Sequence, residues 1–128
     1  MASPRRGLDW TVVTPAEQRL ADKMQALIEV TEEVRQTLLA YEKVSAEVVA
    51  LVRDGHTLAS ALEALQGPVR RRTVTEAMAS FEAARHEVRL AMFALGRENG
   101  TSMSELGRQL GISRQLAARL ARESGELH

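Results

Sequence analysis

The chain has 128 residues, a formal net charge of zero at pH 7 and no cysteine, which excludes disulfides and thiol chemistry. This length suits one domain of ordinary size, or a small domain joined to a long helical arm. Hydrophobic residues make up 45% of the sequence but aromatic residues only 3%, which favours helices packed through small side chains. No apolar run approaches the ~20 residues that cross a bilayer. Since the N-terminus also lacks the apolar stretch of a signal peptide, we expect a cytoplasmic protein.

Residues 1–13 are expected to form an N-terminal arm. The stretch LDWTVV at residues 8–13 is the one segment with extended character, and its Trp10 is a candidate for docking across helices or pairing with a second copy. Arg5 and Arg6 are candidates for contact with a minor groove, as in some N-terminal arms. A disordered terminus is the simpler interpretation of this segment.

The segment Thr14-Pro15-Ala16-Glu17 predicts the start of a long helix. A threonine N-cap, a proline in the first helical position and a glutamate three residues after the cap together form a capping box. No glycine or proline follows until Gly55, so the helix should span about 39 residues and ~58 Å. Residues 14–54 hold eight acidic and five basic side chains, and we therefore expect this arm to stay off nucleic acid.

Apolar residues of this first helix recur in alternating steps of four and three, which indicates a coiled-coil-like partner. Thr31 and Ser45 interrupt the apolar seam. The dimer-interface candidates are Leu20, Met24, Leu27, Val34, Leu38, Tyr41 and Val48. A helix buried against its own chain accounts for the same pattern equally well, so pairing within one chain and pairing between chains both remain open.

After Gly55, residues 57–66 predict a short linking helix. Its apolar face holds Leu58, Ala61, Leu62 and Leu65. Gly67-Pro68 is then expected to break the chain before the run Arg70–Arg72. These arginines are candidates for a phosphate clamp, although a solvated hinge is the simpler interpretation. Residues 14–72 are therefore assigned to packing and oligomerisation.

A second long helix is predicted from Thr73 to about Glu98, opened by a capping box of Thr73 and Glu76. Near its C-terminal end a second apolar stripe begins, formed by Leu90, Phe93 and Ala94. A helix with two apolar faces is expected where one of them supports a further element. Residues 73–128 are therefore assigned to one unit, in which this helix supports the C-terminal segment.

The segment MSELGRQLGISRQLAARLAR, at residues 103–122, predicts two short helices that cross at a steep angle. Such a crossing needs a small residue at the contact, a residue that tolerates positive φ in the turn and a shared apolar core. Gly107 meets the first need and Gly111 the second. The expected core residues are Leu106, Leu110, Ile112, Ala117 and Leu120.

Helix-end signals fit the same register. Ser102 and Glu105 form a capping box at the start of the first short helix, and Ser113 is placed as the N-cap of the second. Gly125 follows the last helical residues as a C-terminal stop. Because the small residue, the turn glycine, the apolar positions and the caps agree, we predict both helices and the turn between them.

In this register, LGRQLGISRQLAARLAR resembles the helix-turn-helix superfamily of bacterial transcriptional regulators. It is similar in particular to the tri-helical form found in small regulators and in the promoter-reading domain of sigma factors. The resemblance covers about a quarter of the chain, or a third with the preceding helix. It implies that residues 113–122 form a recognition helix whose N-terminal end enters the major groove of double-stranded DNA.

Carried onto this chain, the resemblance leaves side chains free for DNA on the second short helix. These are Ser113, Arg114, Gln115, Ala118, Arg119 and Arg122, with Thr101, Ser102 and Ser104 placed for a neighbouring phosphate. Arginine can bind guanine bidentately, and glutamine can bind adenine in the same way. A solvated face is the alternative, because the chain holds 15 arginines and 2 lysines. A helix-turn-helix used only for protein contacts is another.

No catalytic constellation is found in the sequence, and we expect neither an enzyme nor a metal or cofactor. The three histidines lie in a loop, within a helix and at the C-terminus. His86 has Glu82 one turn earlier, a pair that could hold a metal weakly. A surface salt bridge is the simpler interpretation of that pair.

The sequence thus predicts an all-α protein with a long N-terminal helix, a short linking helix, a second long helix and a C-terminal helix-turn-helix. The expected function is sequence-specific DNA binding by a homodimeric transcriptional regulator, cytoplasmic and nucleoid-associated. One alternative is a DNA-packaging or plasmid-maintenance factor that forms higher oligomers. Another is a protein-interaction adaptor that docks on RNA polymerase.

Overall fold

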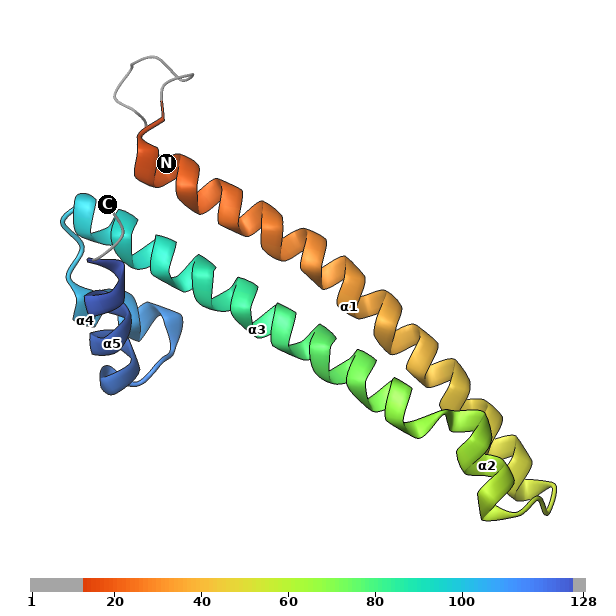
Figure 1. Cartoon of the computed structure of the whole chain (residues 1–128). Helices are drawn as coiled ribbons and strands as arrows, with labels where there is room; N and C mark the ends of the chain where they lie inside the picture. Colours follow the sequence, from red (N-terminus) through yellow and green to blue (C-terminus); the bar gives the residue numbers. More distant parts are fainter. Residues whose placement is uncertain (1–12, 126–128) are drawn as a thin grey trace. The chain divides into compact units, whose positions relative to one another are not determined.

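The computed structural model describes residues 13–125, and every regular element in that range is an α-helix. Figure 1 shows the five helices in chain order, which confirms the predicted all-α fold. They are α1 (Pro15–Arg53), α2 (Leu58–Leu65), α3 (Gly67–Glu98), α4 (Met103–Leu110) and α5 (Arg114–Ser124). The expectations for Arg5, Arg6 and Trp10 in the N-terminal arm lie outside the described residues.

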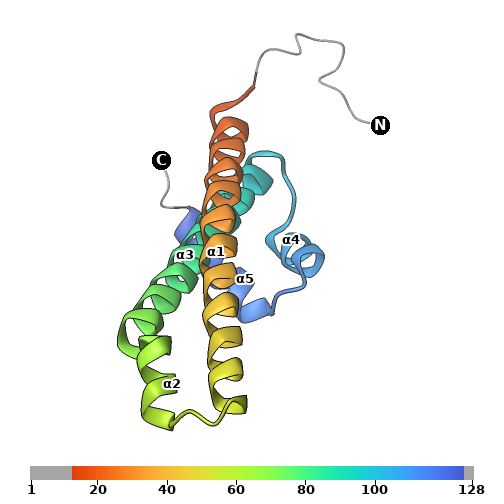
Figure 2. The ribbon, with the colours of Figure 1, turned by 90° about the vertical axis from the view of Figure 1, so that its right-hand side faces the viewer.

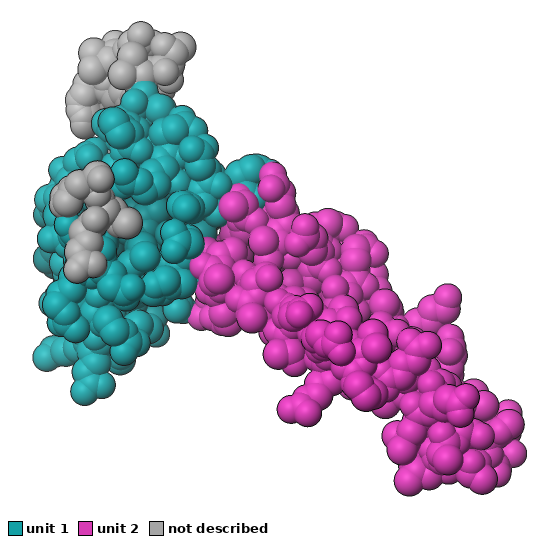
Figure 3. Space-filling model, viewed as in Figure 1, with its two compact units in different colours: residues 1–25, 86–128 teal, residues 26–85 magenta. Residues whose placement is uncertain are grey.

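The helices are organised in two compact units, which Figure 3 distinguishes by colour. Within the described range, the first unit comprises residues 13–25 and 86–125, and the second comprises residues 26–85. Both long helices contribute to both units. The boundary expected between residues 72 and 73 falls inside α3.

The start of α1 follows the predicted capping box. The backbone N–H of Thr14 donates to Oε1 of Glu17 at 2.9 Å, and the N–H of Glu17 donates to Oγ1 of Thr14 at 3.1 Å. Pro15 takes the first helical position, where a missing N–H costs no intrahelical bond. The helix runs for 39 residues as expected and ends before Gly55, whose φ is +86°.

In the second unit, residues 26–53 of α1 lie beside residues 67–85 of α3, and α2 connects them (Figures 1 and 2). Val34 of α1 is buried, and it lines a small cavity together with Ala77 of α3. In α2, Oγ1 of Thr57 accepts from the N–H of Ser60 at 3.1 Å, and Ala61 is buried. The long helices therefore pair within one chain over this unit.

The expected start of the second long helix at Thr73 is wrong, because α3 begins at Gly67. The change of direction occurs at Gln66, which adopts the left-handed conformation with φ of 52°. Pro68 then lies in the first turn of α3, where proline is tolerated because those N–H groups have no intrahelical acceptor. Thr73 is not a cap, since its hydroxyl donates to the carbonyl of Val69 at 2.9 Å.

This correction changes the setting of the arginine run Arg70–Arg72. The run lies in the N-terminal part of α3 and not in the hinge that the sequence suggested. Arg70 is half-buried and the other two are exposed.

The core of the first unit joins α3 to the two C-terminal helices. Leu90 and Phe93 of α3 pack with Ala117 and Leu120 of α5. Partly buried apolar residues surround this cluster: Met103, Leu106, Leu110, Ile112, Leu116 and Ala121. All five core positions predicted for the C-terminal segment belong to this group, as do Leu90 and Phe93 of the predicted second stripe. The end of α3 therefore supports α4 and α5, as expected.

Candidate nucleic-acid interface

Two glycines set the geometry of α4 and α5. A Cβ placed on Gly107 would lie 2.7 Å from Cβ of Ala117, so only glycine allows the two helices to approach this closely. Gly111 has φ of +71°, a conformation that residues with a Cβ adopt at a cost. The N–H of Ile112 returns to the carbonyl of Gly107 at 3.1 Å and closes the turn. Both predicted glycine roles are confirmed.

Serine hydroxyls cap both short helices. Oγ of Ser102 accepts from the N–H of Glu105 at 3.0 Å, and Oγ of Ser113 accepts from the N–H of Leu116 at 3.1 Å. The predicted return bond from Glu105 is replaced by another contact. Its carboxylate accepts from the guanidinium of Arg108 at 2.6 Å and from the amide of Gln109 at 3.0 Å. Both N-caps are therefore confirmed, while Glu105 holds side chains further along α4.

Sequence analysis missed a second close approach, at Gly96 of α3. This glycine is buried, and a Cβ added to it would lie 2.9 Å from Cδ2 of Leu106. The α3 backbone thus receives a leucine of α4 directly. The signal available in the sequence was an isolated glycine within a helical pattern, which often has a packing reason.

Polar contacts between α3 and α5 were also missed. The guanidinium of Arg97 donates to the carbonyl of Ala121 at 2.6 Å and to Oγ of Ser124 at 3.1 Å. Nε2 of His86 lies 3.2 Å from Oε2 of Glu123. These contacts hold the C-terminal half of α5 against its supporting helix. They connect residues 24 to 37 positions apart, so no short sequence pattern predicts them.

The contacts of His86 differ from the pair considered in the sequence. His86 contacts Glu123, whereas Glu82 lies 3.6 Å from the guanidinium of Arg85. Within residues 13–125, no group of three or more metal-ligating side chains is placed to hold an ion. None of the helices in the same range has the length and hydropathy that crossing a bilayer requires.

Most of the side chains expected to contact DNA lie on the exposed side of α5. Ser113, Arg114, Gln115, Ala118, Arg119 and Arg122 are all exposed, whereas Ala117 and Leu120 face the core. At the start of α4, Ser102 and Ser104 are exposed and Thr101 is half-buried. The alternation follows from the helical period, because residues three and four apart share a face.

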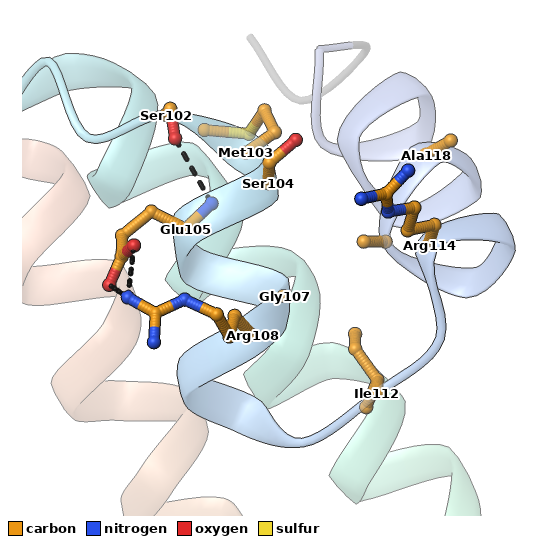
Figure 4. Close-up of a pocket in the computed structure, with 10 residues that line it drawn as sticks. Ser102, Met103, Ser104, Glu105, Gly107, Arg108, Ile112, Arg114 and Ala118 are labelled. Carbon is orange, nitrogen blue, oxygen red and sulfur yellow. Dashed lines mark hydrogen bonds and ion pairs between the residues drawn. The ribbon is translucent and has the colours of Figure 1, made fainter.

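An open cleft of about 670 Å³ separates the N-terminal halves of α4 and α5, and Figure 4 shows its lining. Arg114 and Ala118 line it from α5, while Ser102, Ser104 and Arg108 line it from α4. Gly107 and Ala117, whose close contact joins the two helices, also line it. It places an arginine opposite the hydroxyl groups at the start of α4.

The charges of this segment are distributed unevenly. Residues 101–125 hold four arginines and two glutamates. Each glutamate is engaged, Glu105 with Arg108 and Glu123 with His86. Among the residues that the structure describes, Arg114, Arg119 and Arg122 have no acidic partner. The exposed face of α5 is therefore positively charged, although the whole chain is neutral.

The dimer-interface candidates on α1 differ in how exposed they are. Val34 is buried inside its own chain, whereas Leu20, Leu27 and Val48 are half-buried, and Met24, Leu38 and Tyr41 are exposed. Packing within the chain therefore uses part of the predicted seam. The three exposed residues remain candidates for contact with a partner.

Comparison with protein-family models, with curated proteins and with solved structures finds no match to this chain.

Proposed function

We propose that this chain is a sequence-specific DNA-binding protein that uses α5 as a recognition helix and acts as a homodimeric transcriptional regulator. The observation that carries the proposal is the exposed row Ser113, Arg114, Gln115, Ala118, Arg119 and Arg122. It lies on a short helix fixed against α4 and α3.

The shape of the unit suits the major groove. The groove is ~12 Å wide and accepts one α-helix. The close contact of Gly107 with Ala117 keeps α4 near the backbone of α5, so that α5 can enter the groove while α4 crosses above it. This is the docking geometry of helix-turn-helix proteins, in which the N-terminal residues of the second helix reach the bases.

The chemistry of the row suits base edges and phosphates. Arginine reads O6 and N7 of guanine, glutamine reads N6 and N7 of adenine, and alanine contacts the thymine methyl group. Arg114, Gln115 and Ala118 would supply these contacts from the N-terminal half of α5. Phosphates would bind the free N–H groups at the starts of α4 and α5, where helix dipoles favour negative charge.

The support of α5 favours recognition without a large ordering cost. Arg97 and His86 hold its C-terminal half, and Ser113 caps its N-terminus. A helix that is already in its bound conformation loses less entropy on association. The three arginines without acidic partners need not break an ion pair before they contact DNA.

Selection from a random duplex library with the full chain tests this function. We expect an enriched motif with two-fold symmetry, as a homodimer requires. The triple variant Arg114→Ala/Gln115→Ala/Arg119→Ala should enrich no motif. A matched control, Arg19→Ala/Gln36→Ala/Arg53→Ala, makes the same changes of residue type on the acidic α1 outside the surfaces assigned to DNA and should return the wild-type motif. Absence of any motif with the wild-type chain would contradict the proposal.

A further inference from the structure

A row of exposed apolar side chains runs along α1 within the second unit. Ile28 is 61% exposed, Leu39 51% and Val49 46%. At 3.6 residues per turn, the three positions fall within about 80° of one another around the helix axis, so they lie on one face. Single exposed apolar residues are ordinary, so the case for an interaction surface rests on the apolar groove beside this row.

Leu39, at the centre of this row, also lines an apolar groove of about 490 Å³ between α1 and α3. Leu38 and Leu39 line it from α1, and Met78 and Phe81 line it from α3. Two charged residues of α1, Arg35 and Glu42, also line it. The groove is therefore apolar along its length, with one basic and one acidic side chain on the same helix.

These residues are arranged symmetrically about the midpoint between Leu38 and Leu39. Arg35 and Glu42 are equidistant from that midpoint, and so are Ile28 and Val49. An antiparallel pair of identical helices with its two-fold axis at this midpoint would bring each residue opposite its counterpart. Leu38 would then face Leu39 of the partner subunit, and Ile28 would face Val49 of the partner subunit.

We propose that a second copy of the chain docks on this surface, α1 against α1, antiparallel and centred between Leu38 and Leu39. A two-fold interface uses the same patch on both subunits, which therefore must complement itself. This row complements itself, because its apolar residues face apolar residues and its basic residue faces an acidic one. The partner's α1 fills the groove between α1 and α3, and the dimer buries the exposed leucines of both copies.

Charge selects the antiparallel orientation. In this orientation Arg35 meets Glu42 of the partner subunit, and the contact occurs twice by symmetry. A parallel pair in register would instead oppose arginine to arginine and glutamate to glutamate, which is unfavourable. Glu42 has no hydrogen-bond donor or ion-pair partner among the described residues, while Arg35 already contacts Glu32 and can bridge both acids.

The inference specifies the homodimer of the proposed function but depends only on residues of the second unit. The two ideas can therefore fail separately. A monomer that still selects a DNA motif would contradict the dimer alone. A dimer that selects no motif would contradict the DNA-binding function alone.

Sedimentation equilibrium of the full chain provides the first test. We expect a dimer for the wild-type chain and a monomer for Leu39→Glu, because the partner would bury that carboxylate in an apolar seam. Leu58→Glu is the matched control, since Leu58 is 71% exposed on α2 and lies off the row. It should remain dimeric. A monomeric wild-type chain, or a Leu39→Glu variant as dimeric as wild type, would overturn the proposal.

Engineered cysteines test the orientation without disrupting the charges. The chain has no natural cysteine, so Ile28→Cys/Val49→Cys introduces the only two thiols. Within one helix these positions are ~31 Å apart, far beyond the ~4.4–6.8 Å between Cα atoms that a disulfide spans. Oxidation of the double variant should give a covalent dimer, while each single variant should stay uncrosslinked. Crosslinking of the single variants, or none in the double variant, would contradict the antiparallel register.

Charge exchange gives an independent readout of the same contact. Arg35→Glu should weaken the dimer, because it opposes two acids twice at the interface. Adding Glu42→Arg restores opposite charges across the interface and should restore association to near the wild-type dissociation constant. Failure of this second change to recover the dimer would contradict the pairing of Arg35 with Glu42 of the partner subunit.

Discussion

Gly107 and Ala117 are in direct contact where α4 crosses α5: a methyl group on Gly107 would lie 2.7 Å from the Cβ of Ala117. That single contact sets how closely the two helices approach, and with it the position of α5 relative to its neighbours. The contact between these two residues therefore helps to fix the exposed face that we assign to DNA.

Gly107→Ala should destabilise the chain by about 1–3 kcal/mol, because the added methyl overpacks the helix contact. The cost of overpacking should exceed the gain of about 1 kcal/mol that alanine brings through its better helix propensity. Urea unfolding followed by circular dichroism measures the change. The double variant Gly107→Ala/Ala117→Gly moves the methyl to the other helix and should be more stable than the sum of the single effects predicts. Additive effects would contradict a direct clash.

The turn at Gly111 predicts a graded response to substitution. Its φ of +71° is left-handed, so Gly111→Ala should cost about 1–2 kcal/mol. Gly111→Asn should cost less, since asparagine tolerates this conformation better than alanine. Thermal unfolding of the two variants gives the comparison. An alanine variant as stable as the asparagine variant would show that the turn does not need a left-handed residue.

Arg97→Met should loosen the C-terminal half of α5. The variant loses the bond to the Ala121 carbonyl and leaves the buried Ser124 with one contact fewer. We expect the variant to lose about 1 kcal/mol of stability. It should speed amide hydrogen exchange more in α5 than in α1. Arg89→Met, on the same helix, is the control and should leave exchange in α5 unchanged. Equal exchange in both variants would remove Arg97 from the support of α5.

Arg119 should contribute to reading the DNA motif. Arg119→Ala is expected to weaken binding to the selected duplex by about 1–3 kcal/mol and to relax the preference at one position if the side chain contacts a base. If it contacts a phosphate instead, binding should weaken equally on all sequences and depend less steeply on salt. Titrations of a duplex panel at two salt concentrations separate these outcomes. Affinity equal to wild type on every duplex would exclude Arg119 from the interface.

Local signals predicted much of the fold. Some signals act within a few residues and can therefore be recognised in the sequence. They are the capping box at Thr14, the caps at Ser102 and Ser113 and the turn at Gly111. The start of α3 was mispredicted because Gly67-Pro68 has two interpretations. The pair can separate two helices as a loop. It can also begin a helix when the preceding residue, here Gln66, changes the direction of the chain.

Contacts between distant residues could not be predicted in the same way. The packing of Leu106 on Gly96 and the bonds from Arg97 to the end of α5 depend on how helices meet in space. The symmetry of the α1 row also became visible only once Ile28, Leu39 and Val49 were known to be exposed. In the sequence the heptad pattern of α1 is the stronger signal, and these three residues do not belong to it. The chain itself buries part of that heptad seam.

Fluorescence anisotropy of the selected duplex, against a scrambled duplex of equal length, tests whether α5 reads a DNA sequence. We expect tight binding of the selected duplex by the wild-type chain and by Arg19→Ala/Gln36→Ala/Arg53→Ala. The variant Arg114→Ala/Gln115→Ala/Arg119→Ala should bind both duplexes equally weakly. If the two triple variants lose the same affinity, α5 does not read DNA and the proposed function is wrong.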